Sequence, residues 1–365
     1  MQINSLKLFH FRNFIEESVS FSGGVNLLTG SNGQGKTNLV EAISFVSSGR
    51  SFRTARLADL VLSGSRSGSA FASISHHQTD LDLGIVIERG KKTGYINGEP
   101  VKTLADYAGK LLTVAFSPSD LEIVKGAPFE RRRLLDRHIS ELRPGMIIDY
   151  AAYGRAVKSK NALLSRGNAG RESIMPWNEI IAEHAVRIVN ARQEFVRALG
   201  ARAARIHSAF AAADGELQLN YKSAFAEAGT AAEKEHILRV LELEFSREVE
   251  RGSCAVGPHR DDMQISIGGK DARVFASQGQ TRSVVMALKL AVIELLENAA
   301  GETPVILLDD VDSELDAARS AALFSLIAER QSQVLITATE PRLLEIFGAQ
   351  RCALFSVESG HVKPI

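Results

Sequence analysis

The chain has 365 residues, of which 45% are hydrophobic and 24% charged, an ordinary composition for a globular protein with two or three domain-sized parts. Its formal net charge is +0, so a surface that binds a polyanion must be a local patch rather than the whole molecule. The two cysteines lack metal-ligand spacing, which argues against a disulfide framework or a zinc site, and no apolar run approaches the roughly 20 residues of a membrane span. We therefore expect a cytoplasmic protein with no membrane partner.

The first quarter of the chain is rich in predicted strands. Residues 6–11 alternate apolar and polar side chains, as a half-buried strand does, and residues 69–74 and 81–87 repeat the pattern. Asn97 and Gly98 form a dipeptide that is a strong hairpin signal. These features predict an antiparallel layer.

The segment 30–37 has the P-loop pattern G-x-x-x-x-G-K-T, which cradles the phosphates of a nucleoside triphosphate. A predicted strand, 25–29, leads into it, and a predicted helix, 38–43, leaves it. The glycines let backbone N–H groups converge on phosphate oxygens, and the helix N terminus adds partial positive charge. We expect Lys36 to reach the β- and γ-phosphates as a catalytic residue, and Thr37 to hold Mg²⁺. The expected nucleotide-binding residues of this segment are Gly30, Ser31, Asn32, Gly33, Gln34, Gly35, Lys36, Thr37 and Asn38.

The middle of the chain has an almost entirely helical pattern. Residues 180–189 have the spacing of an amphipathic helix, but no heptad repeat is long enough for an extended coiled coil, and no Cys-x-x-Cys hook is present. The α/β pattern returns after about residue 250. We therefore predict a head whose N-terminal part is 1–127 and C-terminal part is 251–365, with an inserted helical arm at 128–250.

Residues 304–310 are a near-continuous apolar run that ends in Asp309 and Asp310, the profile of a buried parallel strand. In P-loop ATPases such a strand supplies the second acid of the magnesium site. We expect Asp309 to hold Mg²⁺ with Thr37, and Asp310 to act as the catalytic general base that polarises the attacking water. The two motifs lie nearly three quarters of the chain apart, so the residues between them are inserted into one nucleotide-binding fold.

Two further motifs flank this strand. Residues 276–282 open a helix predicted to run to about 297, and a small, Gly-containing helix N terminus is an anion site. ATP-binding-cassette (ABC) proteins carry their signature motif at this position, and their D-loop where residues 313–316 stand. The expected nucleotide contacts from these motifs are Ser277, Gln278, Gly279, Gln280 and Asp316.

With these motifs in order, the chain resembles the RecF family, the SMC-like recombination-mediator ATPases of bacteria. The resemblance covers essentially the whole chain and includes five further segments: 6–14, 49–53, 116–121, 130–133 and 257–262. It implies an α/β fold, namely an ABC-type, SMC-like P-loop ATPase head with a mixed sheet and an antiparallel β layer, plus an inserted α-helical arm.

The resemblance also implies a function. A family member is expected to be a slow, switch-like DNA-dependent ATPase of recombinational repair and replication-fork maintenance, associated with the nucleoid, with ATP and Mg²⁺ as cofactors. It forms an ATP-dependent homodimer on gapped or junction DNA, helps load RecA with RecR and RecO, and contributes to the SOS response. In ABC-type dimers each ATP lies between the Walker motifs of one subunit and the signature of the other, so Ser277 and Gly279 would touch the γ-phosphate in trans.

Several positions depart from the ABC pattern. Gln278 replaces the first signature glycine, and Asp310 replaces the usual glutamate, so a shorter base implies slower hydrolysis. Thr339 stands where a switch histidine is common, and Asp312 is polar where an apolar or aromatic residue is expected. No glutamine marks a Q-loop near 116–118.

DNA binding rests on the resemblance, since the net charge does not support it. Basic side chains in four clusters are candidates for phosphate contact: Arg50, Arg53 and Arg56; Lys91 and Lys92; Arg131, Arg132 and Arg133; and Arg155, Lys158 and Lys160. The third cluster shares a predicted helix with acidic residues, so internal ion pairs are the competing interpretation there. Aromatic residues make up only 6%, which favours double-stranded or junction DNA over single strands. His259 lies in a predicted turn near the signature helix, where it would face the dimer interface.

Three other functions compete. Another ABC-type ATPase, such as a transporter ATPase subunit, is disfavoured by the long split between the Walker motifs and by the absence of an LSGGQ match. An SMC-like nuclease partner would need long coiled coils and a cysteine hook. A small-molecule kinase would leave the signature motif unexplained.

Overall fold

The computed structural model describes residues 1–77, 79–167, 170–227, 229–310, 327, 330, 332–339 and 352–365. These residues form two compact units. The head unit is Met1–Leu121 with Val285–Ile365, and the arm unit is Glu122–Val284. The boundaries expected from the sequence were 127/128 and 250/251. The second boundary falls later in the structure because β10 (Asp262–Ile267) pairs with β9 (Leu217–Lys222) of the arm unit.

One sheet of the head unit has six strands in the order β2-β1-β4-β5-β6-β7, each antiparallel to its neighbours. Alternate residues of β4 are buried, so the sequence alternation follows from a sheet with one face on the core. The antiparallel layer predicted from the sequence is confirmed. Its strands are β1 (Gln2–Phe11), β2 (Phe14–Ser20), β4 (Ser67–His76), β5 (Thr79–Glu88), β6 (Lys91–Ile96) and β7 (Glu99–Pro100).

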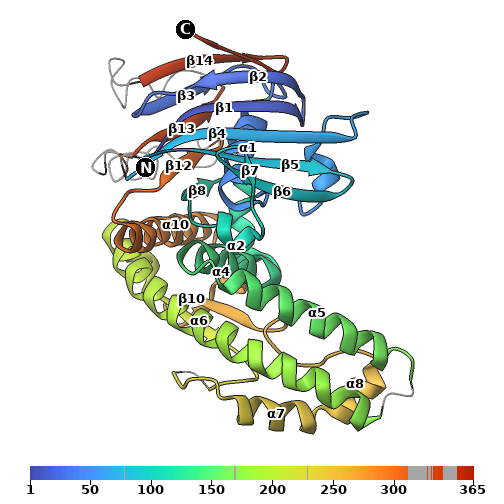
Figure 1. Ribbon diagram of the computed structural model, residues 1–365. Coiled ribbons are helices and arrows are strands. Elements are labelled where there is room, and N and C mark those ends of the chain that lie inside the picture. Colours follow the sequence, from blue (N-terminus) through green and yellow to red (C-terminus); the bar gives the residue numbers. More distant parts are fainter. Residues whose placement is uncertain are drawn as a thin grey trace. The chain divides into compact units, whose positions relative to one another are not determined.

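The other sheet of the head unit is mixed, with the order β15-β14-β3-β13-β12-β8 (Figure 1). Only β15 is antiparallel to its neighbour among these described strands. All residues of β12 and β13 are buried, as expected of strands covered on both faces. Because β13 lies between β3 and β12, the carboxyl end of the P-loop strand is brought to the same sheet edge as the acids that follow β12. The strands are β3 (Val25–Thr29), β8 (Thr113–Phe116), β12 (Val305–Leu308), β13 (Val334–Ala338), β14 (Cys352–Glu358) and β15 (His361–Pro364).

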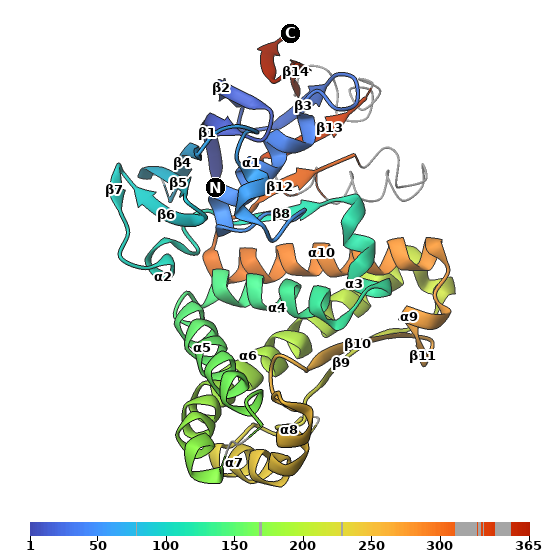
Figure 2. The same cartoon turned by 90° about the vertical axis from the view of Figure 1, so that its right-hand side faces the viewer.

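Helix α1 (Lys36–Ser48) contacts strands of both sheets, and Figure 2 shows it between them. Its buried residues include Leu39 and Ile43, which join a core shared by the two layers. The helix ends at Gly49, whose φ of 66° is left-handed and whose N–H donates to the Phe45 carbonyl. Among the residues that the structure describes, the other helical segments wholly within this unit are η1 (Leu57–Leu60), α2 (Leu104–Tyr107) and η2 (Pro118–Leu121).

The arm unit is mainly helical, and its longest helix, α6, has 41 residues. The sequence predicted helices throughout this region and missed β9, a short strand that pairs with residues 40 to 50 positions later. A small sheet with the order β11-β10-β9 packs on α6 through β9. The elements are α3 (Glu122–Lys125), α4 (Pro128–Leu142), α5 (Met146–Leu164), α6 (Arg171–Ala211), η3 (Ala212–Asp214), α7 (Lys234–Leu243), α8 (Phe245–Arg251), β11 (Lys270–Asp271) and α9 (Ala272–Phe275). Helix α10 (Gln278–Ala300) begins in the arm unit, and its residues from Val285 onward belong to the head unit.

Candidate nucleotide site

The P-loop connects β3 to α1, as the sequence predicted. Gly30, Gly33 and Gly35 have φ values of 147°, 81° and 120°, a backbone that side chains other than glycine rarely adopt. A Cβ atom on Gly30 would lie 2.3 Å from the carbonyl oxygen of Val357 in β14. Ser31, Asn32 and Gly33 are exposed at the tip of the loop. The loop therefore presents its backbone to solvent while its base is packed against the sheet.

Lys36 begins α1, and its ammonium group folds back over the loop. It donates hydrogen bonds to the carbonyl oxygens of Gly30 at 2.5 Å and Ser31 at 3.0 Å. Burial lowers the pKa of Lys36, and the negative charges of Asp310 and Asp309 oppose that change. The lysine thus belongs to the same electrostatic site as the two acids after β12.

Thr37 and Asp309 meet although 272 positions separate them in the sequence. The Thr37 hydroxyl donates to Asp309 Oδ1 at 2.8 Å, and Asp309 is only 5% exposed. Burial raises the pKa of Asp309, whereas hydrogen bonds from Thr37 and Thr337 act in the opposite direction. Hydroxyl and carboxylate oxygens are ligands that Mg²⁺ prefers, so this pair fits the metal expected beside the phosphates.

Thr337, in β13, holds both acids and was not singled out from the sequence. Its hydroxyl donates to Asp309 Oδ1 at 2.9 Å and accepts the backbone N–H of Asp310 at 2.9 Å. Asp310 has a φ of 52°, so this hydrogen bond supports a backbone that is costly for aspartate. The sequence feature that could have indicated Thr337 is that it is the polar residue within an otherwise apolar, buried strand. Thr339, which the sequence did single out, is exposed after the end of β13.

Residues from both ends of the chain support the P-loop at Gln34. The Gln34 carbonyl accepts hydrogen bonds from Asn13 Nδ2 at 3.1 Å and from the Gly360 N–H at 3.1 Å. Its side-chain oxygen accepts the Ser359 N–H at 2.7 Å. Asn38 donates to Asn13 Oδ1 at 2.7 Å, which links α1 to the same support. Sequence reasoning missed Ser359 and Gly360 because the turn between β14 and β15 carries no phosphate-binding pattern of its own.

Glu41, on α1, is fully buried, and its carboxylate binds charged and polar side chains that lie beside the site. Arg12 makes two hydrogen bonds to its carboxylate, at 2.7 and 2.8 Å, and Ser51 donates a further one. Arg53 lies 3.3 Å from Glu41 and donates to Asn38 Oδ1 at 2.8 Å. Arg53, a candidate DNA contact in the sequence, is therefore tied to the first helix after the P-loop.

The signature segment forms the N terminus of α10. Ser277 Oγ accepts the Gln280 N–H at 3.1 Å, and Gln280 Oε1 accepts the Ser277 N–H at 2.9 Å, which is a capping box. Ser277 and Gln278 are exposed. Of the expected D-loop and neighbouring positions, Asp312 and Asp316 lie outside the described residues.

Two members of the basic clusters, Arg131 and Lys160, are buried, so the phosphate contacts expected of them are wrong. Arg131 is 3% exposed and pairs with Asp262 at 2.7 Å, and Lys160 is fully buried against Glu248 at 2.6 Å. Burial, together with the charge of Arg50, lowers the pKa of Lys92 to about 8. Arg132 donates to the Asp261 carbonyl, and Lys92 donates to the Gly49 carbonyl. The exposed members are Arg50, Arg53, Arg56, Lys91, Arg155 and Lys158.

His259 contacts the interior of the arm unit, and its place at a dimer interface stays a prediction. Its Nδ1 lies 2.6 Å from the Tyr153 hydroxyl. Burial, followed by the positive charge of Arg260, lowers the pKa of His259 to about 4. The imidazole is therefore neutral at physiological pH and packs as part of the arm.

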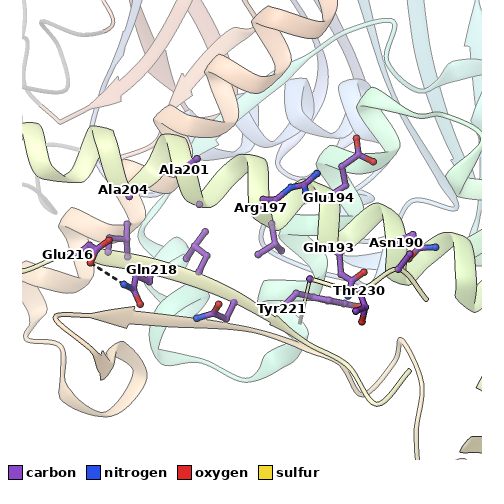
Figure 3. A pocket seen from close by; sticks show the side chains of 17 residues that line it. Asn190, Gln193, Glu194, Arg197, Ala201, Ala204, Glu216, Gln218, Tyr221 and Thr230 are labelled. Atoms are coloured by element: carbon purple, nitrogen blue, oxygen red, sulfur yellow. Dashed lines mark hydrogen bonds between the residues drawn. The ribbon is translucent and has the colours of Figure 1, made fainter. Parts of the chain in front are cut away.

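A groove of about 830 Å³ runs between α6 and β9 of the arm unit (Figure 3). The side chains along it include Gln193 and Arg197 from α6 and Gln218 from β9. Its lining holds no histidine or cysteine, so it offers neither an imidazole base nor a thiol nucleophile. The P-loop site is the stronger candidate for chemistry.

The comparisons with known proteins agree with this geometry. A family model for the RecF/RecN/SMC N terminal domain matches residues 2–363. The DNA replication and repair protein RecF of Symbiobacterium thermophilum is 38% identical over 368 residues, which cover 99% of this chain and 98% of that protein. This chain belongs to the RecF family. The RecF of Myxococcus xanthus is 34% identical over 368 residues, with 99% of this chain and 97% of that protein covered.

The solved structures place this RecF-family chain in the same fold. A structure described as the recombination mediator protein RecF-ATP in the RecFOR pathway has a TM-score of 0.91 and 30% identity, covering 100% of this chain and 97% of that one. An Smc head, at TM-score 0.56 and 17% identity, shares the fold. The predicted SMC-like ABC ATPase fold, with its mixed sheet and antiparallel layer, is confirmed. Over the described residues, none of the helices combines the length and apolarity that crossing a bilayer requires.

Proposed function

We propose that this RecF-family chain binds ATP with Mg²⁺ at the P-loop and hydrolyses it, as a slow switch in recombinational DNA repair and replication-fork maintenance. The observation that carries the proposal is the 2.8 Å contact between Thr37 and Asp309, which joins the two halves of a nucleotide site across 272 positions. The similar solved structure described as RecF-ATP supports ATP as the nucleotide.

In the proposed reaction, the exposed N–H groups of the P-loop and the N terminus of α1 bind the phosphates. Lys36 moves from the loop carbonyls to the β- and γ-phosphates. Thr37 and Asp309 would hold Mg²⁺, which would supply charge neutralisation at the phosphate oxygens when bound. Asp310 orients the attacking water and accepts its proton as the water oxygen bonds to the γ-phosphorus; the bond from that phosphorus to the β–γ bridging oxygen breaks, and ADP leaves with the electron pair. Thr337 keeps both acids in place without touching the substrate.

The proposed switch is a dimer that ATP holds together. Ser277 and Gly279 of a second copy would contact the γ-phosphate, with Asp316 nearby, and hydrolysis would release the two chains. The exposure of Ser277 and Gln278 at the N terminus of α10 supports this role, because helix N–H groups that the capping box does not use can meet an anion.

DNA, gapped or at a junction, is the proposed partner, and RecR, RecO and RecA are the proposed protein partners in a cytoplasmic, nucleoid-associated setting. The relatives are named DNA replication and repair proteins, and the similar solved structure is described within the RecFOR pathway, which supports this assignment. The exposed basic side chains Arg50, Arg56, Lys91, Arg155 and Lys158 are the proposed phosphate contacts.

Analytical ultracentrifugation with and without ATP and gapped DNA tests the switch. We expect a dimer only with ATP, lost in Lys36→Arg and Ser277→Arg but retained in Asp310→Asn, which binds ATP without hydrolysing it. Ser208→Arg, the same change at an exposed serine of α6, is the matched control and should dimerise normally. A monomer under every condition that still hydrolyses ATP would overturn the dimer and leave an ordinary P-loop ATPase.

A further inference from the structure

Two histidines and a glutamate converge in the head unit at the turn between β4 and β5. His76 Nδ1 lies 2.9 Å from Glu302 Oε2, and His77 Nδ1 lies 3.1 Å from Glu302 Oε1. One donor atom from each residue lies within 4.8 Å of the other two. Glu302 follows α10, 226 positions after His76, so no local spacing could have revealed the cluster.

The backbone at His77 makes this convergence feasible. Successive side chains of a strand point to opposite faces, yet the rings of His76 and His77 have centroids only 4.3 Å apart. His77 has a φ of 46° in a tight hairpin turn, which brings its ring to the side of its neighbour. Asparagine and glycine are favoured in such a turn, and histidine is also among the residues that adopt this left-handed conformation, so the turn accommodates His77 without strain that only a ligand could explain.

The three donors have the chemistry and the spacing of a transition-metal site. Zn²⁺ binds imidazole nitrogen and carboxylate oxygen at about 2.0–2.2 Å in a tetrahedron, which places neighbouring donors about 3.3 Å apart. The nitrogen–oxygen distances of 2.9 and 3.1 Å, each to a different oxygen of Glu302, are close to that spacing, and one donor atom of each residue lies within 4.8 Å of the other two. His77 is 56% exposed, so solvent can supply the remaining ligand. We propose that His76, His77 and Glu302 bind a zinc ion, with water completing the coordination.

A cluster held only by hydrogen bonds is the competing explanation. Glu302 accepts the His77 N–H at 2.5 Å, and the ammonium group of Met1 lies 3.4 Å from its other oxygen. Burial disfavours ionisation of Glu302, but hydrogen bonds from His77 and His76 and the Met1 charge outweigh it and lower its pKa. The carboxylate is therefore ionised with or without a metal. Only the metal explanation requires that both imidazoles bind the same added zinc ion.

Zinc at this site would connect the β4–β5 turn to the segment that leads into β12, the strand that ends beside Asp309. The site uses histidines and a glutamate, so the cysteine pattern that argued against zinc in the sequence does not bear on it. Binding should stabilise the head unit, because the ion ties two segments that are far apart in the chain.

Zinc titration of the full-length chain tests the proposal. The protein is prepared without a polyhistidine tag and with its N-terminal amine unblocked. A chelator removes bound metal ions, and excess Mg²⁺ is then added so that the oxygen ligands of Thr37 and Asp309 are occupied. Calorimetry should show one zinc ion per chain, and zinc should raise the melting temperature. His76→Ala and Glu302→Gln should each weaken binding about tenfold or more, since even the loss of groups behind the ligands costs 10–100-fold.

Two further variants keep the test decisive. His77→Asn suits the left-handed turn, so it should fold at least as well as the wild type without metal, yet lose the zinc-induced rise in melting temperature. His361→Ala removes a histidine 3.2 Å from Glu17, a single imidazole–carboxylate pair, and should leave zinc affinity unchanged. Equal zinc affinity in wild type and His77→Asn, or no binding by the wild type, would overturn the proposal.

Discussion

Replacing Thr337 with valine should weaken the nucleotide site and the head unit together. Thr337 is 1% exposed, and its hydroxyl serves Asp309 Oδ1 and the Asp310 N–H, each at 2.9 Å. Valine keeps the shape and removes both hydrogen bonds. Losing a bond to a carboxylate costs about 1.5–3 kcal/mol, and a buried N–H left without an acceptor costs about 1–3 kcal/mol. Because one hydroxyl makes both bonds, we expect the free energy of unfolding to fall by about 2–4 kcal/mol.

The assay pairs scanning calorimetry with phosphate release, and Thr337→Ser is the matched control. Serine keeps the hydroxyl and loses one methyl group, which costs about 1 kcal/mol. A unit of this size loses about 2–4 °C in melting temperature for each kcal/mol, so the valine variant should melt roughly 5–15 °C lower than the wild type. Its ATP turnover should fall about tenfold or more, because Asp310 loses the bond that holds its backbone. Equal melting temperatures and turnover for the valine and serine variants would refute the reasoning.

Three further predictions concern the site and the arm. Burial raises the pKa of Asp309, so its contribution to stability is lost as pH rises through that pKa. Without nucleotide and Mg²⁺, Asp309→Asn should therefore have a higher melting temperature than the wild type at neutral pH, and the difference between the two melting temperatures should shrink as the pH is lowered. The variant should also release no phosphate. A melting temperature below that of the wild type at neutral pH would contradict this reasoning. Gly30→Ala puts a Cβ 2.3 Å from a backbone oxygen and should abolish binding of a fluorescent ATP analogue, whereas Gly90→Ala, with no atom within 4 Å, should bind normally. Arg131→Ala breaks a buried ion pair, so urea denaturation should show a free energy of unfolding about 3–5 kcal/mol lower, whereas the exposed Arg155→Ala should leave it unchanged. If Arg131→Ala were as stable as the wild type but lost DNA affinity, the ion pair would not be structural.

The sequence alone determined the features that are written in consecutive residues. The P-loop pattern, the strand 25–29 before it and the apolar run before Asp309 depend on neighbours within a few positions, and the structure has β3, α1 and β12 there. The alternation that predicted the antiparallel layer is equally local, because one face of each strand meets the core. The same motifs, read in order, were enough to indicate the RecF family.

Tertiary structure decided which distant residues share a site. The position of β13 between β3 and β12 makes Thr337 the support for both acids, and no pattern around residue 337 states this. The partner of a charged side chain is likewise set by the fold, so Arg131 and Lys160 look like phosphate contacts in sequence but are neutralised inside the arm. Sequence patterns record the period of helices and strands, whereas hydrogen bonds and ion pairs depend on distances in space between residues that can be hundreds of positions apart.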